Sequence, residues 1–187
     1  MYVNNCVVFD VDKTIFFQDL HTLLIKKWLA SGDFYRQFLF KAHEISLKFL
    51  IFNFLKRRFE YFVLQFIDCK MIEKYIIEIM ADDSLTNLDL LKRIERYKIL
   101  GADVFLVSAA PLLIIEPLAR VLNITAFCSK TIFGLITKDL LSKKNSIYVH
   151  IEKKLKIKIR SIYSDSILDF HKNSKNILIV GRLKVYS

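Results

Sequence analysis

The feature that most constrains this chain is an apolar run near its start that ends in two aspartates. Residues 6–15 read Cys-Val-Val-Phe-Asp-Val-Asp-Lys-Thr-Ile, and the run Cys6–Phe9 is typical of a buried parallel strand. Ligands of open α/β sheets bind beyond the carboxyl ends of the strands, where Asp10 and Asp12 would lie. Two carboxylates this close repel each other unless a cation or a proton relieves them. The stretch therefore predicts either a ligand site at the end of this strand or, more simply, a strand followed by an Asp-rich turn.

A second apolar run, Val104–Val107, ends in Ser108 and is followed by Ala-Ala-Pro. Before it, residues 87–100 have the apolar spacing of an amphipathic helix, which Gly101 would close. Ser108 therefore precedes a helix start, where free backbone N–H groups bind phosphate oxygens well. An ordinary helix cap is the alternative for this serine, and the local pattern leaves both open.

A hairpin, a helix and a third strand follow. Residues 131–137 predict a short hairpin with Gly134 in its turn. Apolar residues three, four and seven positions after Lys144 favour this lysine, over its neighbour Lys143, as the first core-facing residue of a helix. A strand at residues 161–163 then leads to Asp165 and Asp169, which would share one face if a helix follows and could hold one Mg²⁺ ion. Residues 176–181 predict a final strand.

Residues 20–81, called the insertion below, form a long proline-free segment with helical apolar spacing. Ser31-Gly32-Asp33 indicates a break between two of its helices. The apolar run at 47–55, followed by Lys-Arg-Arg, is too short to span a bilayer. It predicts either a helix buried in a small helical subdomain or an interfacial helix on anionic lipid, and the choice stays open.

Charge and cysteine content narrow the class of protein. The 187 residues carry a net charge of +10, and residues 138–187 hold 12 basic against 4 acidic side chains. An anionic partner follows: a phosphorylated substrate, a nucleic acid or an acidic membrane surface. The 3 cysteines and 4 histidines show no zinc-ligand spacing, and the start lacks the basic region of a signal peptide. We therefore expect a cytoplasmic protein, with peripheral contact at the inner membrane face as an open alternative.

Taken together, four segments resemble the motifs of the haloacid dehalogenase (HAD) superfamily, in its phosphoserine-phosphatase-like subclass IB. They are Asp10-x-Asp12-x-Thr14, Ser108 with the mid-helix Pro117, Lys144, and Asp165-x-x-x-Asp169. The resemblance implies an α/β fold, a Rossmann-like doubly wound parallel sheet with an inserted helical cap. The catalytic core would comprise residues 1–19 and 82–187, and the cap residues 20–81. Lys13 and Ser164 depart from the pattern, since both stand where the family often has glycine.

The resemblance also implies a function, an Mg²⁺-dependent phosphomonoester hydrolase that works through an aspartyl-phosphate. Asp10 would be the nucleophile and Asp12 the general acid and base. Phosphate would be bound by Thr14, Ser108 and Lys144, with Lys143 as the alternative lysine. Mg²⁺ would be held by Asp10, the backbone carbonyl of Asp12 and Asp165, with Asp169 in support. The substrate would be a small phosphorylated metabolite or a lipid-linked phosphate.

The same composition also suggests a function of a different class. Basic and aromatic residues together also suit a non-catalytic binding module for RNA or an anionic membrane surface, built on the same core. The joint presence of Asp10, Asp12, Ser108, Lys144 and the Asp165/Asp169 pair favours the enzyme. We accordingly do not expect a nucleic-acid partner.

Overall fold

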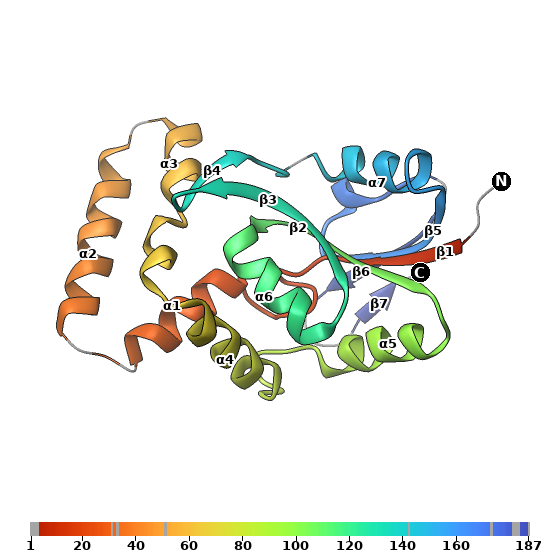
Figure 1. Cartoon of the computed structure of the whole chain (residues 1–187), viewed down its shortest axis with the longest axis horizontal. Helices are drawn as coiled ribbons and strands as arrows, with labels where there is room; N and C mark the ends of the chain where they lie inside the picture. Colours follow the sequence, from red (N-terminus) through yellow and green to blue (C-terminus); the bar gives the residue numbers. More distant parts are fainter. Residues whose placement is uncertain are drawn as a thin grey trace.

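The computed structural model describes residues 4–30, 32, 34–50, 52–141, 143–172, 174–180 and 184–186. Within these residues seven strands form one sheet in the order β4-β3-β2-β1-β5-β6-β7 (Figure 1). The strands are β1 (Asn4–Phe9), β2 (Asp103–Pro111), β3 (Thr125–Ile132), β4 (Leu135–Lys138), β5 (Ile157–Ser164), β6 (Lys175–Val180) and β7 (Lys184–Tyr186).

The five inner strands are parallel, and β4 and β7 are antiparallel edges. At the centre, Phe9 of β1 pairs with Leu106 of β2 on one side and with Tyr163 of β5 on the other. The carboxyl ends of these three strands therefore meet at one edge of the sheet. This register brings together the predicted site residues that lie at or just after the ends of β1, β2 and β5.

Alternate residues of β1 face two separate cores. Val7 and Phe9 belong to the main apolar cluster, to which α5 and α6 contribute, whereas Cys6 and Val8 pack in a smaller cluster with Tyr148 of α7. A strand buried on both faces reads as a continuous apolar run, which is why its sequence shows no alternation. Helices thus cover both faces (Figure 1), and the predicted doubly wound α/β fold is confirmed.

The helices and 3₁₀ turns have the following bounds: α1 (Leu20–Ala30), α2 (Phe34–Phe49), α3 (Asn53–Phe59), η1 (Phe62–Phe66), α4 (Cys69–Met80), α5 (Leu88–Ile99), α6 (Leu112–Leu122), α7 (Lys144–Lys153) and η2 (Ile167–Asp169). Helix α5 ends as its sequence predicts. Gly101 has a φ of 71° and its N–H donates to the carbonyl of Lys98. Glycine adopts this left-handed conformation without strain. Gly134 likewise lies in the predicted hairpin turn between β3 and β4.

The insertion leaves the sheet after β1 and returns before α5. Its two ends are joined, because the Phe17 N–H donates to the Leu85 carbonyl and the Asn87 N–H to the Ile15 carbonyl, both across 2.8–2.9 Å. Helices α1 and α4 bury their apolar faces in the main cluster. Helix α2 lies at the outer end of the molecule, away from the sheet (Figure 1). The division into core and cap at residues 19/20 and 81/82 stays a prediction.

Three expectations need correction. The apolar run at 47–55 is not one buried helix: α2 ends at Phe49, α3 begins at Asn53, and none of the α2 side chains, all of them described, is buried. The segment after Asp165 is the three-residue turn η2 rather than an α-helix. Strand β7 was not predicted at all.

Some predictions fall on residues outside the described part of the chain. These residues are Ser31 and Asp33 of the predicted break, Ile51 of the apolar run and Gly181 of the final strand.

Candidate active site

A cavity of about 280 Å³ opens where β1, β2 and β5 end. The core supplies its charged floor, and the insertion supplies the opposite wall. The floor residues include Asp10, Asp12, Lys144, Asp165 and Asp169, and the wall residues are His21, Arg57, Glu60 and Tyr61. Lys143, the alternative lysine, is exposed and does not line this cavity. The sheet edge that the sequence predicted as a ligand site is therefore hollow and charged.

A buried lysine joins two carboxylates at the centre of the floor. Lys144 begins α7, and its Nζ lies 2.9 Å from Asp10 Oδ2 and 2.7 Å from Asp169 Oδ2. The three side chains are only 8–10% exposed. Burial opposes the charge of Lys144, but the two carboxylates outweigh burial and raise the pKa of the ammonium. A positive charge is thus held at the tip of β1, where a phosphate group would need it.

The carboxylate of Asp10 is fixed in place by the sheet and by its own backbone. The Asp10 N–H donates to the Tyr163 carbonyl at 2.9 Å, and the Val11 N–H donates to Asp10 Oδ1 at 2.8 Å. Burial raises the pKa of Asp10, while Lys144 opposes that rise. The oxygen that faces Lys144 is held at the surface of the cavity in a single orientation.

Asp12 and Thr14, which follow β1, form hydrogen bonds with the start of α1 and with the end of β5. Asp12 Oδ1 accepts the N–H of Leu20, the first residue of α1, at 2.7 Å, and burial raises the pKa of this carboxyl. Thr14 is fully buried, and its Oγ1 accepts the Asp165 N–H at 3.0 Å. The threonine therefore joins the ends of β1 and β5 and does not line the cavity. Lys13, which lies between these two residues, has a φ of 56°. This left-handed conformation costs a residue other than glycine about 1 kcal/mol.

Three carboxylates converge in a way that suits a divalent cation. One oxygen each from Asp10, Asp165 and Asp169 lies within 4.8 Å of the others. Lys144 is the one ammonium among the described residues that forms an ion pair with this group, so three carboxylates face one positive charge, and Asp12 adds a fourth carboxylate to the cavity. Hard carboxylate oxygens are the ligands that Mg²⁺ takes in proteins. Lys144 contacts Asp10 Oδ2 as well as Asp169 Oδ2, so a cation bound here would share both carboxylates with the lysine.

Ser108 lies within β2 rather than at a helix start. The strand continues to Pro111, and α6 begins at Leu112 with no side-chain cap. The helix-cap alternative for Ser108 is therefore wrong. Its buried Oγ accepts the Ala110 N–H at 3.0 Å, while Ala109 and Ala110 themselves line the cavity. Ser108 thus shapes the turn at the cavity wall, but it is buried and does not itself line the cavity.

Ser164 is a site residue that sequence reasoning noted only as a departure from the family pattern. Its fully buried Oγ donates to Asp169 Oδ2 at 2.6 Å, lies 3.4 Å from Asp10 Oδ2, and accepts the Ser166 N–H. A hydroxyl therefore stands beside both carboxylates that Lys144 joins. The signal was present in the sequence, because a polar residue occupied a position where glycine was expected, directly before Asp165.

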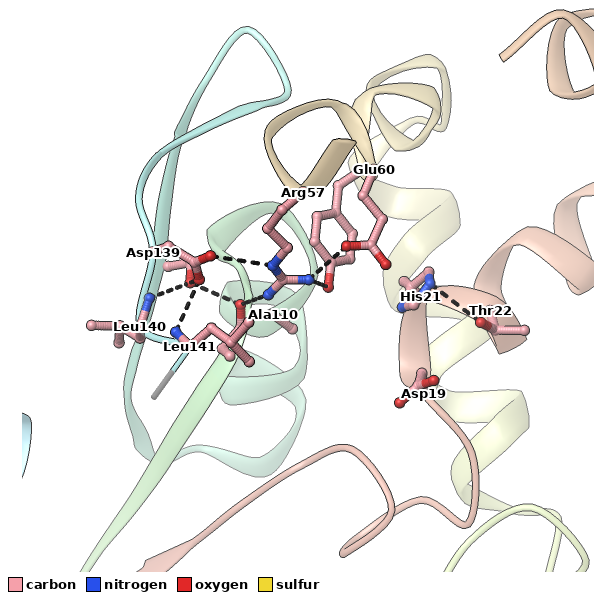
Figure 2. Close-up of polar contacts among 12 residues, drawn as sticks. Asp19, His21, Thr22, Arg57, Glu60, Ala110, Asp139, Leu140 and Leu141 are labelled. Carbon is pink, nitrogen blue, oxygen red and sulfur yellow. Dashed lines mark hydrogen bonds and ion pairs between the residues drawn. The ribbon is translucent and has the colours of Figure 1, made fainter. Parts of the chain in front are cut away.

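Arg57 was missed entirely, because the basic run at 56–58 was interpreted as a surface cluster. Figure 2 shows its guanidinium reaching from α3 between Asp139 and Glu60. It donates to Asp139 Oδ2 at 3.3 Å, to Glu60 Oε2 at 2.7 Å, to the Ala109 carbonyl at 2.9 Å and to the Tyr61 hydroxyl. Arg57 thus connects the insertion to the end of β2 and to the segment after β4. No local pattern distinguishes it from Lys56 or Arg58.

We expect Arg57→Met to loosen the insertion at this contact. Hydrogen bonds to charged groups contribute about 1.5–3 kcal/mol each, so the loss of several of them should lower the free energy of unfolding by about 2 kcal/mol or more. Hydrogen exchange should accelerate in residues 53–66 and stay unchanged in β1 and β5. The control is Arg58→Met, because Arg58 is exposed and, among the described residues, donates only to the Ile136 carbonyl at 3.3 Å. Equal effects of the two variants would contradict the role assigned to Arg57.

Comparison with known proteins agrees with this geometry. The sequence profile described as haloacid dehalogenase-like hydrolase matches residues 7–171. A search among proteins of curated function gave no match. The match to the profile includes every charged floor residue of the cavity.

Solved structures of similar fold share little sequence with this chain. A phosphoserine phosphatase, solved as a phospho-aspartyl intermediate analogue, has a TM-score of 0.50 at 17% identity, over 85% of this chain and 77% of that one. DsGPDH of Dunaliella salina has a TM-score of 0.54 at 21% identity, over 89% of this chain and 28% of that one. A protein of unknown function from Bordetella pertussis Tohama I has a TM-score of 0.47 at 15% identity, over 72% and 65%. At these identities the likeness concerns the fold alone.

Proposed function

Since the chain belongs to the haloacid dehalogenase-like hydrolase family, we propose that it is an Mg²⁺-dependent phosphatase that hydrolyses phosphomonoesters through an aspartyl-phosphate. The observation that carries the proposal is the buried Lys144, which joins Asp10 and Asp169 beside Asp12 at the end of β1. A structural ion pair does not need a cavity, whereas a phosphate site does. The same fold is found in a phosphoserine phosphatase captured as a phospho-aspartyl analogue.

The metal would be held by Asp10, Asp165 and the backbone carbonyl of Asp12. When bound, Mg²⁺ offsets the negative charge of a phosphoryl group and of the carboxylates around it. Asp169 would keep Lys144 directed at the site, and Ser164 would keep Asp169 in place. These supporting contacts fix the charges before the substrate arrives, so little reorganisation is needed during the reaction.

In the first step an Asp10 carboxylate oxygen bonds to phosphorus as the bond between phosphorus and the ester oxygen breaks. Asp12 gives its proton to the departing oxygen, which leaves as an alcohol. In the second step Asp12 takes a proton from water, the water oxygen bonds to phosphorus, and the bond between phosphorus and Asp10 breaks. Inorganic phosphate leaves and both carboxyl groups return to their starting state. The raised pKa of Asp12 supports its role as proton donor.

Lys144 and Ser108 would bind phosphoryl oxygens during both steps. The lysine is already at the cavity floor. Ser108 is itself buried, but its neighbours Ala109 and Ala110 line the cavity, and its hydroxyl hydrogen would turn toward the phosphoryl group from the end of β2. Thr14 we assign to positioning, because its Oγ1 joins the ends of β1 and β5 through the Asp165 N–H, and its hydroxyl hydrogen is a second candidate donor. The cavity, at about 280 Å³, is slightly smaller than the usual range for ligand sites, about 300–1,000 Å³. A small phosphorylated metabolite or the head of a lipid-linked phosphate fits this space.

The proposal is tested by metal dependence and by trapping the intermediate. We expect hydrolysis of p-nitrophenyl phosphate, or of a member of a phosphomonoester panel, with Mg²⁺ and none with excess EDTA. Acid quenching during turnover of a ³²P-labelled substrate should leave label on the protein, released at alkaline pH as expected of an acyl phosphate. A protein that binds Mg²⁺ but neither turns over nor retains label from any panel member would overturn the proposal in favour of a binding module.

A further inference from the structure

Helix α2 carries an apolar stripe that the fold does not use. Phe34, Phe38, Ile45 and Phe49 are 54–84% exposed. Their spacings of four, seven and four residues place them on one face of the helix. No residue of α2, all of them described, is buried, although the helix contains four phenylalanines. Contiguous exposed apolar surface of this kind marks an interaction site on a folded protein.

The opposite face of α2 accounts for how the helix attaches to the rest of the chain. Leu39 and Phe40 are partly buried against the main cluster, and a His43 ring nitrogen lies 3.2 Å from the Glu60 carbonyl. These positions lie roughly half a turn from the stripe. The stripe is therefore not a core face that happens to be poorly packed, since α2 already has a core face.

Positive charge accompanies the stripe. Lys41 and Lys48 are exposed and seven residues apart, so both lie along the same edge of it. Lys56 and Arg58 of the following helix are also exposed. Residues 34–59 contain six basic side chains and one acidic side chain. An apolar face bordered by cations complements anionic lipid head groups above acyl chains.

An apolar groove lies on the inner side of α2, between the stripe and the face that attaches the helix, and includes Leu39 and His43 of that face. It has a volume of about 400 Å³ and lies between α2 and the α3–η1 segment. Ala42, Ser46 and Leu47 line it from α2, and Phe59 and Phe62 line it from the α3–η1 segment. Its size and apolar lining suit an acyl chain. A face that binds lipid would gain from such a groove, whereas a flat protein contact would not require it.

We propose that the outer face of α2 docks on an anionic membrane surface, with the helix lying in the plane of the interface. The aromatic and aliphatic stripe inserts among the acyl chains, and the flanking lysines contact anionic head groups. Among the described residues no helix is both long and apolar enough to cross a bilayer. Figure 1 places α2 at the outer end of the molecule, where a planar surface can reach it.

Vesicle flotation tests this proposal without reference to catalysis. The full chain is mixed with vesicles of phosphatidylcholine alone or with 40% phosphatidylglycerol, at about 50 and 500 mM NaCl. We expect binding to the anionic vesicles that is reduced at high salt. The double substitution Phe38→Ser, Phe49→Ser should weaken binding at least about tenfold. Ile99→Ser is the matched control, because Ile99 is 84% exposed at the end of α5, away from α2.

Charge reversal tests the second half of the proposal. Lys41→Glu with Lys48→Glu should abolish the preference for anionic vesicles, whereas Lys153→Glu with Lys154→Glu on the exposed end of α7 should keep it. Absence of binding by the unaltered chain, or equal binding by all variants, would overturn the proposal. Self-association that Phe38→Ser, Phe49→Ser abolishes would overturn it as well, in favour of a second copy on this face. Phosphatase turnover, measured in the same preparations, separates this outcome from failure of the catalytic proposal.

Discussion

Asp10→Asn is expected to lower turnover of a phosphomonoester by at least about 10³-fold, the scale seen when a covalent nucleophile is removed. The amide keeps the size of the side chain but cannot bond to phosphorus. Lys144 retains Asp169 at 2.7 Å, so the variant should keep its fold. Label from ³²P-substrate should no longer remain on the quenched protein. The measurement is steady-state hydrolysis at saturating Mg²⁺, with thermal unfolding to confirm folding.

The matched control for this substitution is Asp89→Asn, which makes the same chemical change on the exposed first turn of α5. It should leave turnover within twofold of the unaltered chain. Turnover of Asp10→Asn within tenfold of the unaltered chain would rule out Asp10 as the nucleophile. Residual activity without retained label would indicate instead a direct attack by water.

Lys144→Met should produce the largest loss of stability of any single change at the site. The substitution removes the one ammonium that pairs with Asp10 and Asp169 among the described residues, and it leaves two buried carboxylates facing each other. Breaking a buried ion pair by removing one partner costs about 3–5 kcal/mol. Urea unfolding measures the loss. Adding Mg²⁺ should reduce it, because a divalent cation supplies the missing positive charge.

Lys143→Met is the control for this second change, since Lys143 precedes Lys144 but is exposed. Surface substitutions usually change the free energy of unfolding by less than about 0.5 kcal/mol. Comparing the two variants also decides which lysine belongs to the site. The sequence favoured Lys144 over Lys143 but left the alternative open. If Lys143→Met and Lys144→Met lowered the free energy of unfolding equally, loss of the ion pair at the cavity floor would not explain the effect of Lys144→Met.

The sheet and the floor of the cavity could be predicted because their signals are local. Each buried strand is a short apolar run, and Asp10, Lys144 and Asp165 stand directly at a strand end or helix start. Parallel strands then bring their ends to one edge, whatever the loops between them do. The family profile and the sheet order confirm the predicted fold. The roles of the individual side chains stay predictions until they are measured.

The wall of the cavity could not be predicted, because it depends on how distant segments dock. Arg57 meets the Ala109 carbonyl across 52 positions of sequence, and nothing near residue 57 indicates that contact. The apolar run at 47–55 was predicted to be buried or interfacial from its composition. Burial requires an apolar partner surface, however, and the chain offers α2 a partner on one face alone. The bond from the Asp165 N–H to Thr14 Oγ1 spans 151 positions and could not be predicted from the sequence either, while the phosphate contact of Thr14 stays a prediction.

The joined ends of the insertion have a consequence for how such a protein can diversify. Phe17 pairs with Leu85 and Asn87 with Ile15, α1 and α4 are packed together into the core, and Arg57 ties α3 to the end of β2. Helix α2, none of whose side chains is buried, is therefore the part of the insertion that stands free of the catalytic floor. Doubling the length of such an outer segment costs about 0.6 kcal/mol in closure entropy. That outer segment can therefore be lengthened, shortened or exchanged between homologues at small cost to folding. New surfaces can arise there while the residues that perform the chemistry stay unchanged.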